Sequence, residues 1–260
     1  MTSDQSEREG IPPTVEVPGW GADMPWLTHG TTTRGAGETA FDLRLHASTS
    51  EEGTPRRWDA LRRWDALRHS LAMDAVVVSR QVHGSTLRVH EGGWAGLLLA
   101  PPADGHLTRA PGLLLAVTLA DCVPLFVVAP EHRVIGLVHA GWRGTADGIV
   151  EHVIATFEAR FGIEPRDLRI HLGPAIGGAS YEVGPEVFDA LGEPVPPGPA
   201  KLDLRGVILE RAVEAGVDPH EISRSTVDTL RDPDFFSHRG GDVGRHIAFL
   251  GIRSPADPDS

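Results

Sequence analysis

Hydrophobic residues along this chain fall mainly into short runs that are rich in β-branched residues and bounded by glycine, proline or polar residues. Runs of this length and composition are typical of β-strands. The pattern predicts strands at residues 75–79, 86–90, 113–119, 125–129, 134–139, 168–172 and 246–251.

Four other segments repeat their apolar residues at the spacing of an α-helix. These are residues 55–72, 145–161, 185–191 and 203–215. In the second segment Thr145 is the expected N-cap and Gly162 follows the expected end. Because several strands follow one another through short turns, without regular alternation with helices, the pattern predicts an α+β fold with mixed, largely antiparallel sheets.

One hexapeptide, RWDALR, occurs twice in succession at residues 57–62 and 63–68. A six-residue repeat is out of phase with 3.6 residues per turn, yet its tryptophans and leucines still fall on one broad face. The interspersed aspartates argue against a nucleic-acid-binding arm. We therefore interpret the repeat as part of an amphipathic surface helix.

Composition narrows the class of protein. The chain has 260 residues, 40% of them hydrophobic, which is enough for a sizeable core. A formal net charge of −12 argues against nucleic acid as a partner. No signal-peptide pattern opens the chain, and Asp121 and Pro124 interrupt its longest apolar stretch, so we expect a cytoplasmic protein that does not bind membranes.

The organisation expected from the sequence is simple. Residues 1–19 have the composition of a flexible leader and residues 254–260 that of a flexible tail. Between them, residues 20–253 contain no linker long enough to separate two domains. The Pro-rich segment 193–200 is interpreted as a surface loop, so one domain is expected.

The chain has a single cysteine, Cys122, so no internal disulfide can form. If residues 123–129 and 134–140 form a hairpin centred near Glu131, residues that face each other have numbers summing to about 262. Cys122 then lies opposite Ala140 and beside His139. A thiolate and an imidazole at the open end of one hairpin can share a metal ion.

A third candidate ligand is His83, which lies between two expected strands. Zinc accepts two histidines and one cysteine and leaves a fourth coordination position open. Two plainer interpretations remain at this stage. A cysteine between apolar residues is often a small core residue, and Asp121 can cap a turn.

The segment GWRG, residues 141–144, precedes the second expected helix. Free backbone N–H groups at a helix start and the guanidinium of Arg143 suit a phosphate or carboxylate, although a tight turn with a surface arginine has the same pattern. The glycine-rich loops at residues 173–178 and 240–245 match neither a P-loop nor a dinucleotide fingerprint, so no nucleotide cofactor is expected.

Taken together, these segments resemble a known family. RQVHG, ADGHLT, TLADCVPL, HAGWRGT, LGPAIGGASYEVG and FFSHRGGDVGR occur in order from about Thr28 to Ile252. They are similar to the laccase-domain proteins, formerly called multicopper polyphenol oxidases and now regarded as purine nucleoside phosphorylases. The resemblance implies layered mixed sheets around one cleft, with His83, Cys122 and His139 as the metal ligands.

The resemblance also implies an activity. Family members cleave adenosine, inosine, guanosine and methylthioadenosine with phosphate, and they deaminate adenosine. We therefore expect a zinc enzyme whose partners are a nucleoside and phosphate, with Cys122, Arg143 and Asp121 as catalytic residues. The alternative is a peptidoglycan-editing factor that acts on cell-wall precursors, as some bacterial members are described.

Copper oxidation, which the older family name implies, is the least favoured activity. A multinuclear copper cluster needs many closely spaced histidines, and no His-x-His occurs in the sequence.

Three positions depart from the family pattern, and none is an expected ligand. Val227-Asp228 replaces a common Cys-Thr pair, Gly240 replaces a second arginine, and Asp42-Leu43 replaces Asn-Leu. These departures bear on substrate preference.

Overall fold

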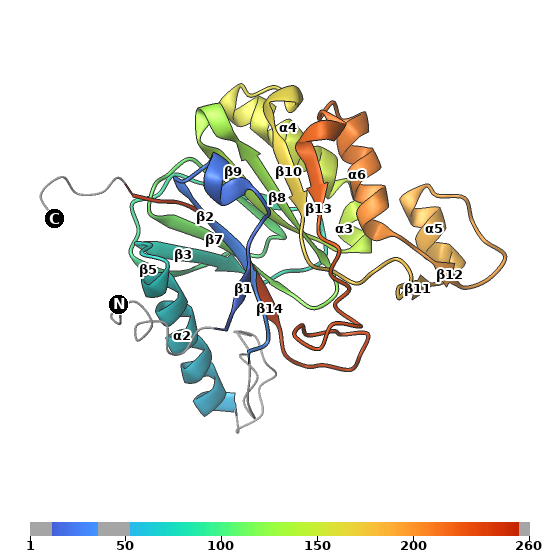
Figure 1. Ribbon diagram of the computed structural model, residues 1–260, viewed down its shortest axis with the longest axis horizontal. Helices are drawn as coiled ribbons and strands as arrows, with labels where there is room; N and C mark the ends of the chain where they lie inside the picture. The colour runs from blue at the N-terminus through green and yellow to red at the C-terminus, as the bar shows by residue number, and fades with distance from the viewer. Residues whose placement is uncertain (1–11, 36–52, 255–260) are drawn as a thin grey trace, which may run out of the picture.

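The computed structural model describes residues 12–35 and 53–254, and two six-stranded sheets dominate it (Figure 1). The first sheet has the strand order β1-β2-β14-β7-β3-β5 and the second β13-β10-β8-β9-β6-β4. The strands of the first sheet are β1 (Thr14–Val15), β2 (Leu27–Thr32), β14 (His246–Ile252), β7 (Leu113–Leu119), β3 (Ala75–Ser79) and β5 (Gly96–Ala100). Those of the second are β13 (Ile222–Arg224), β10 (Arg169–Leu172), β8 (Val123–Ala129), β9 (Val134–Ala140), β6 (Gly105–Thr108) and β4 (Leu87–His90). A short pair, β11 (Glu182–Val183) and β12 (Ala200–Lys201), stands apart.

The two large sheets pack face to face around a shared apolar core. Strands β8 and β9 have every residue buried, so the side chains on both faces of this hairpin are apolar, with His139 as the one exception. One face meets the first sheet across a layer formed by Phe126, Val128, Ile135, Leu137, Leu115, Val117 and Leu250. The register of this hairpin decides which side chains face each neighbouring layer, since a slip of one residue would exchange the two faces.

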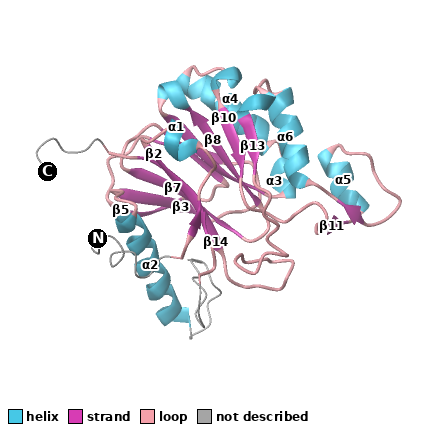
Figure 2. Ribbon diagram, in the orientation of Figure 1, coloured by secondary structure: helices cyan, strands magenta, loops and turns pink. Residues whose placement is uncertain are grey.

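Helices cover the two outer faces (Figure 2). Helices α4 (Ile149–Phe161) and α6 (Leu204–Glu214) pack on the second sheet, and α2 (Gly53–Ser70) packs on the first. Three short helices, α1 (Trp20–Asp23), α3 (Trp142–Ala146) and α5 (Pro185–Leu191), lie in the connections. None of the described helices is long and apolar enough to cross a membrane.

The expected fold class is confirmed. Seven of the eleven described strand pairs are antiparallel, and the parallel pairs join β3 to β5 and β7, β4 to β6, and β10 to β13. The seven strands and four helices expected from periodicity are all present within a few residues, except that the second helix is divided.

That division corrects the predicted helix over residues 145–161. Gly148 adopts a left-handed backbone with φ of +81°, which ends α3 and precedes α4. Thr145 therefore lies inside α3, with Gly141 as the N-cap, and does not cap the longer helix.

Seven described strands were not predicted: β1, β2, β5, β6, β11, β12 and β13. β2 is fully buried although three of its six residues are threonines, so it shows no alternation of apolar and polar positions. β5 and β6 are short, and each begins at a glycine. Because glycine is typical of turns and loops, the sequence pattern did not indicate strands there.

The predicted flexible ends overlap only partly with the described residues. Residues 1–11 of the expected leader and 255–260 of the expected tail lie outside them. Thr14 and Val15 pair with Thr32 and Thr31 of β2, so part of the expected leader belongs to the first sheet.

The repeated hexapeptide lies in α2, as predicted, and its second tryptophan anchors that helix. Trp64 is completely buried against the first sheet. We expect Trp64→Ala to lower the free energy of unfolding by about 3–5 kcal/mol, because a large cavity would remain. Urea denaturation measures this loss. Trp94→Ala is the matched control, since Trp94 is 41% exposed and its replacement should cost less than about 1 kcal/mol. Equal losses in the two variants would show that α2 is not anchored at Trp64.

Candidate metal centre

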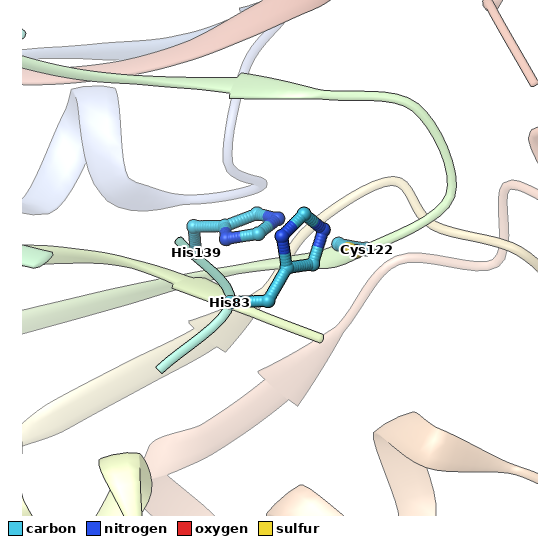
Figure 3. Close-up of side chains that lie close together, drawn as sticks. All are labelled: His83, Cys122 and His139. Carbon is cyan, nitrogen blue, oxygen red and sulfur yellow. The ribbon is translucent and has the colours of Figure 1, made fainter. Parts of the chain in front are cut away.

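The structure brings the three predicted metal ligands together at one end of the sheet sandwich (Figure 3). His83 follows β3, Cys122 lies between β7 and β8, and His139 is the penultimate residue of β9. One ligand atom from each residue lies within 4.8 Å of the other two. The two imidazole rings are nearly perpendicular, with their centroids 4.8 Å apart. His139 is buried and His83 is exposed, so the group reaches from the protein interior to solvent.

Pairing of β8 with β9 places Cys122 beside His139. Val123 pairs with Ala140 and Pro124 with His139, so facing residues have numbers that sum to 263 and not 262. The difference arises in the turn, where the four residues 130–133 separate the paired residues Ala129 and Val134. Cys122 consequently lies just beyond the paired region, beside Gly141 rather than opposite Ala140.

Two glycines allow these segments to approach each other. A Cβ atom on Gly141 would lie 3.1 Å from the Cys122 sulfur and 3.4 Å from His83 Cδ2. A Cβ atom on Gly144 would lie only 2.6 Å from the backbone oxygen of Gly84. The glycines of the GWRG segment therefore serve close packing around the ligands, a role that sequence reasoning did not assign to them.

A buried carboxylate, Asp104, holds both histidine segments. Its side chain is fully buried and accepts a hydrogen bond from His139 Nδ1 at 3.0 Å. It also accepts backbone N–H groups from His83 and Gly84, each at 2.9 Å, and from Val82 at 3.2 Å. These bonds hold His83 in a left-handed conformation with φ of +59°.

Asp104 also sets the chemistry of His139. A proton on Nδ1 directed at the carboxylate leaves Nε2 as the nitrogen available to a metal ion. Sequence reasoning missed this residue. Asp104 is the second residue of the ADGHLT segment, and that segment was noted only as part of the family pattern. Its contacts with His83 and His139 depend on tertiary structure.

Electrostatics favour a thiolate in the site. Burial alone would raise the pKa of Cys122, but the His139 imidazolium and hydrogen bonds from both histidines lower it. Burial alone would likewise lower the pKa of His139, but the Cys122 thiolate and Asp104 raise it. The pKa of Asp104 is lowered by its hydrogen bonds despite burial. A thiolate and two imidazoles form a donor set that zinc accepts, so the residues present fit the ion.

A cavity of about 540 Å³ opens over the three residues. Besides the ligands, the residues that line it and carry functional groups are Ser79, Arg80, Gln81, Thr118, Asp121, Trp142, Arg143, Tyr181, His238, Arg239 and Arg245. Burial and the nearby Cys122 thiolate raise the pKa of Tyr181 to about 12, so its phenol stays protonated and can donate a hydrogen bond. Tyr181 and His238 were not singled out from the sequence, although Tyr181 is the only tyrosine of the chain.

Arg143, which we expected to bind an anion, is exposed in α3 and lines the cavity. Its guanidinium carbon lies 4.4 Å from the centroid of the Trp142 ring.

Asp121, the third expected catalytic residue, also lines the cavity, but its carboxylate holds the surrounding loops. One oxygen accepts the Thr229 hydroxyl and the other the Arg239 backbone N–H, both at 2.7 Å. Its backbone oxygen accepts the N–H of Ile176. Asp121 has a left-handed backbone, with φ of +85°. Its hydrogen bonds join three loops next to Cys122, so its role here is to position these loops.

Two of the positions that depart from the family pattern are described. Asp228 accepts hydrogen bonds from the backbone N–H groups of Gly177 and Leu230 and from the Ser180 hydroxyl, so it supports the GPAIGG loop. Gly240 donates its backbone N–H to the Ser237 hydroxyl. Asp42-Leu43 lies outside the described residues.

We expect Asp104→Asn to weaken metal binding by about 10- to 100-fold, because the amide cannot accept all the N–H groups that the carboxylate accepts. Competition of the folded variant with a chelator measures the metal affinity. Asp147→Asn is the control, since this exposed acid lies close to the site in sequence and outside the cavity lining. Unchanged affinity in a folded Asp104→Asn variant would limit the carboxylate to a role in folding.

Comparison with known proteins finds relatives that match most of the chain. The chain is 33% identical to a protein of Geobacillus stearothermophilus named purine nucleoside phosphorylase YlmD, over 86% of this chain and 89% of that protein. It is 34% identical to a purine nucleoside phosphorylase of Deinococcus radiodurans, over 87% and 89% of the two chains.

Solved structures share the fold. The crystal structure of YlmD from Geobacillus stearothermophilus has a TM-score of 0.80 at 32% identity, covering 89% of this chain and 93% of that one. The hypothetical protein YfiH of Bacillus licheniformis has the same TM-score at 27% identity, covering 93% and 97%. The sequence pattern of one family matches residues 28–253 and so includes all three converging ligands. The chain therefore belongs to the family described as multi-copper polyphenol oxidoreductase laccase.

Proposed function

We propose that this protein is a zinc-dependent purine nucleoside phosphorylase. It would convert adenosine, inosine, guanosine or methylthioadenosine and phosphate into the free base and a pentose 1-phosphate. The observation that carries the proposal is a His-Cys-His group that opens into a cavity lined by arginines. Relatives that share most of this chain are named purine nucleoside phosphorylases, which supports the assignment.

The cavity suits two small substrates. Its volume of about 540 Å³ lies within the usual range for small-molecule sites. Trp142 and Tyr181 offer aromatic surface for a purine, and the protonated phenol of Tyr181 can donate a hydrogen bond to it. Arg143 offers two parallel N–H groups to a phosphate.

In this reaction a phosphate oxygen forms a bond to the anomeric carbon of the sugar while the bond from that carbon to the purine nitrogen breaks. The released base takes up a proton. Arg143 would orient the phosphate and offset its charge, and binding both substrates in one cavity lowers the entropic cost of their encounter. A bound zinc ion would supply Lewis acidity at the base of the cavity. Asp121 would hold the loop that carries Arg239 in place through its hydrogen bonds.

The site does not favour the oxidase chemistry of the family description. Among the described residues, His83, Cys122 and His139 form the one group of three or more metal-binding side chains within reach of a single ion. A multicopper cluster needs several such groups close together. A cell-wall editing role stays the runner-up, and the release of a purine base distinguishes the two functions.

The deciding experiment incubates metal-replete protein with adenosine, with and without phosphate, and separates adenine from inosine. We expect adenine and ribose 1-phosphate only when phosphate is present. Inosine formed without phosphate would demonstrate the additional adenosine deaminase activity that we also propose. If none of the four nucleosides releases its base in the presence of phosphate, the phosphorylase assignment is wrong.

Replacement of Cys122 by serine separates a metal ligand from a small core residue. We expect Cys122→Ser to lose bound metal and to reduce turnover by about 100-fold or more, because a neutral hydroxyl is a poor zinc donor. Metal analysis, turnover and circular dichroism are measured together at a temperature where the variant is folded. The control is the chelated wild-type protein, in which zinc should restore activity. A folded serine variant with full metal and full turnover would refute the ligand role.

A further inference from the structure

The cavity above the metal ligands is cationic although the chain as a whole is acidic. Four arginines line it, Arg80, Arg143, Arg239 and Arg245, whereas the chain carries a net charge of −12. Asp121 is the one acidic residue in the lining, and both its oxygens already accept hydrogen bonds from neighbouring loops. Among the residues that line the cavity, the arginines therefore outnumber the acidic side chains.

Two of the four guanidinium groups are used to hold the surrounding chain. Arg239 donates to the backbone oxygen of Glu182 at 2.7 Å and lies 5.3 Å from the centroid of the Tyr181 ring. Arg245 donates to the backbone oxygens of Gly244 at 2.7 Å and Val243 at 3.2 Å. Both guanidinium groups therefore bind backbone oxygens of the loops around the cavity.

Among the described residues, the guanidinium groups of Arg80 and Arg143 bind no backbone oxygen. Within residues 12–35 and 53–254, neither guanidinium forms a hydrogen bond or an ion pair, and the recorded contact of Arg143 is with the ring of Trp142. Arg80 precedes His83 by three residues, and Arg143 follows His139 by four. Each histidine segment of the metal centre thus carries one uncommitted guanidinium into the cavity.

The backbone beneath both arginines is fixed. Next to Arg80, the Gln81 side chain donates to the backbone oxygen of Thr118 and accepts its backbone N–H and its hydroxyl, each at 2.8 Å. The carboxylate of Asp104 accepts the backbone N–H groups of the three residues after Gln81. Next to Arg143, Gly144 packs against the backbone of Gly84. Because the backbone is already fixed, these two side chains lose less conformational freedom when a ligand binds between them.

We propose that Arg80 and Arg143 together clamp a dianionic oxyanion beside the metal centre, with inorganic phosphate as the ligand. Two guanidinium groups match the charge of phosphate near neutral pH, and each offers a planar pair of N–H groups to its oxygens. Arg80 is the new element, a phosphate-binding residue from the opposite histidine segment. The identification of phosphate rests on the proposed function, whereas the clamp itself is a binding property.

The test measures binding of inorganic phosphate to zinc-loaded protein by isothermal titration calorimetry, without nucleoside. Arg80→Gln and Arg143→Gln should each raise the Kd for phosphate by roughly 10- to 100-fold, because each removes charge-assisted hydrogen bonds. Arg80→Lys should fall between the wild type and Arg80→Gln, since it keeps the charge and loses the paired N–H groups. Arg160→Gln is the matched control, because Arg160 is exposed at the end of α4 and outside the cavity lining. Metal content should be equal in all the proteins.

The clamp is wrong if Arg80→Gln binds phosphate as the wild type does, or if the zinc-loaded wild type binds no phosphate at millimolar concentration. Its failure is distinguishable from failure of the proposed function. Weaker phosphate binding by Arg80→Gln without base release from any purine nucleoside would keep the clamp and reject the phosphorylase. Phosphate-dependent base release with an unchanged KM for phosphate in Arg80→Gln would do the reverse.

Discussion

The candidate metal centre depends on one buried carboxylate that is shared by two parts of the chain. Asp104 accepts N–H groups from the segment of His83 and from the ring of His139, so it fixes the backbone of one ligand and the orientation of the other. A carboxylate without solvent is costly unless its oxygens are satisfied, and here four N–H donors satisfy them. The same hydrogen bonds therefore offset the desolvation cost of burying Asp104 and place the two histidines around Cys122.

Aspartates play a related part in the loops that contribute residues to the cavity lining. Asp121 and Asp228 accept backbone N–H groups from other loops, and Asp242 accepts one from Ser237 in its own loop and pairs with Arg34. Because their negative charges are directed at these loops, the arginines that face the cavity are left to determine its electrostatic character. An acidic protein can in this way present a cationic binding site.

The family name and the site describe different chemistry. The family is described as a multi-copper polyphenol oxidoreductase laccase, whereas relatives that match most of the chain are named purine nucleoside phosphorylases. The described residues form one group of three metal-binding side chains beside arginines. A site for a single ion next to cationic side chains fits transfer of a group to an anionic acceptor better than electron transfer through a copper cluster.

The fold class, seven of the fourteen described strands, the longer helices and the proximity of Cys122 to His139 could be predicted from the sequence, because these follow from local periodicity and from the pairing of two adjacent strands. The pairing of β8 with β9 was predicted one residue out of register, because a hydrophobic pattern does not show where a four-residue turn has its centre. The sequence pattern gave no other sign of the correct register. It missed β2, whose buried threonines break the alternation, and the division of the helix at Gly148. Tertiary structure alone decided that Asp104 joins His83 to His139, that Gly141 and Gly144 make room for the ligands, and that Arg80 shares a cavity with Arg143. Each of these contacts joins residues from segments far apart in the chain, and no local pattern encodes such a distance.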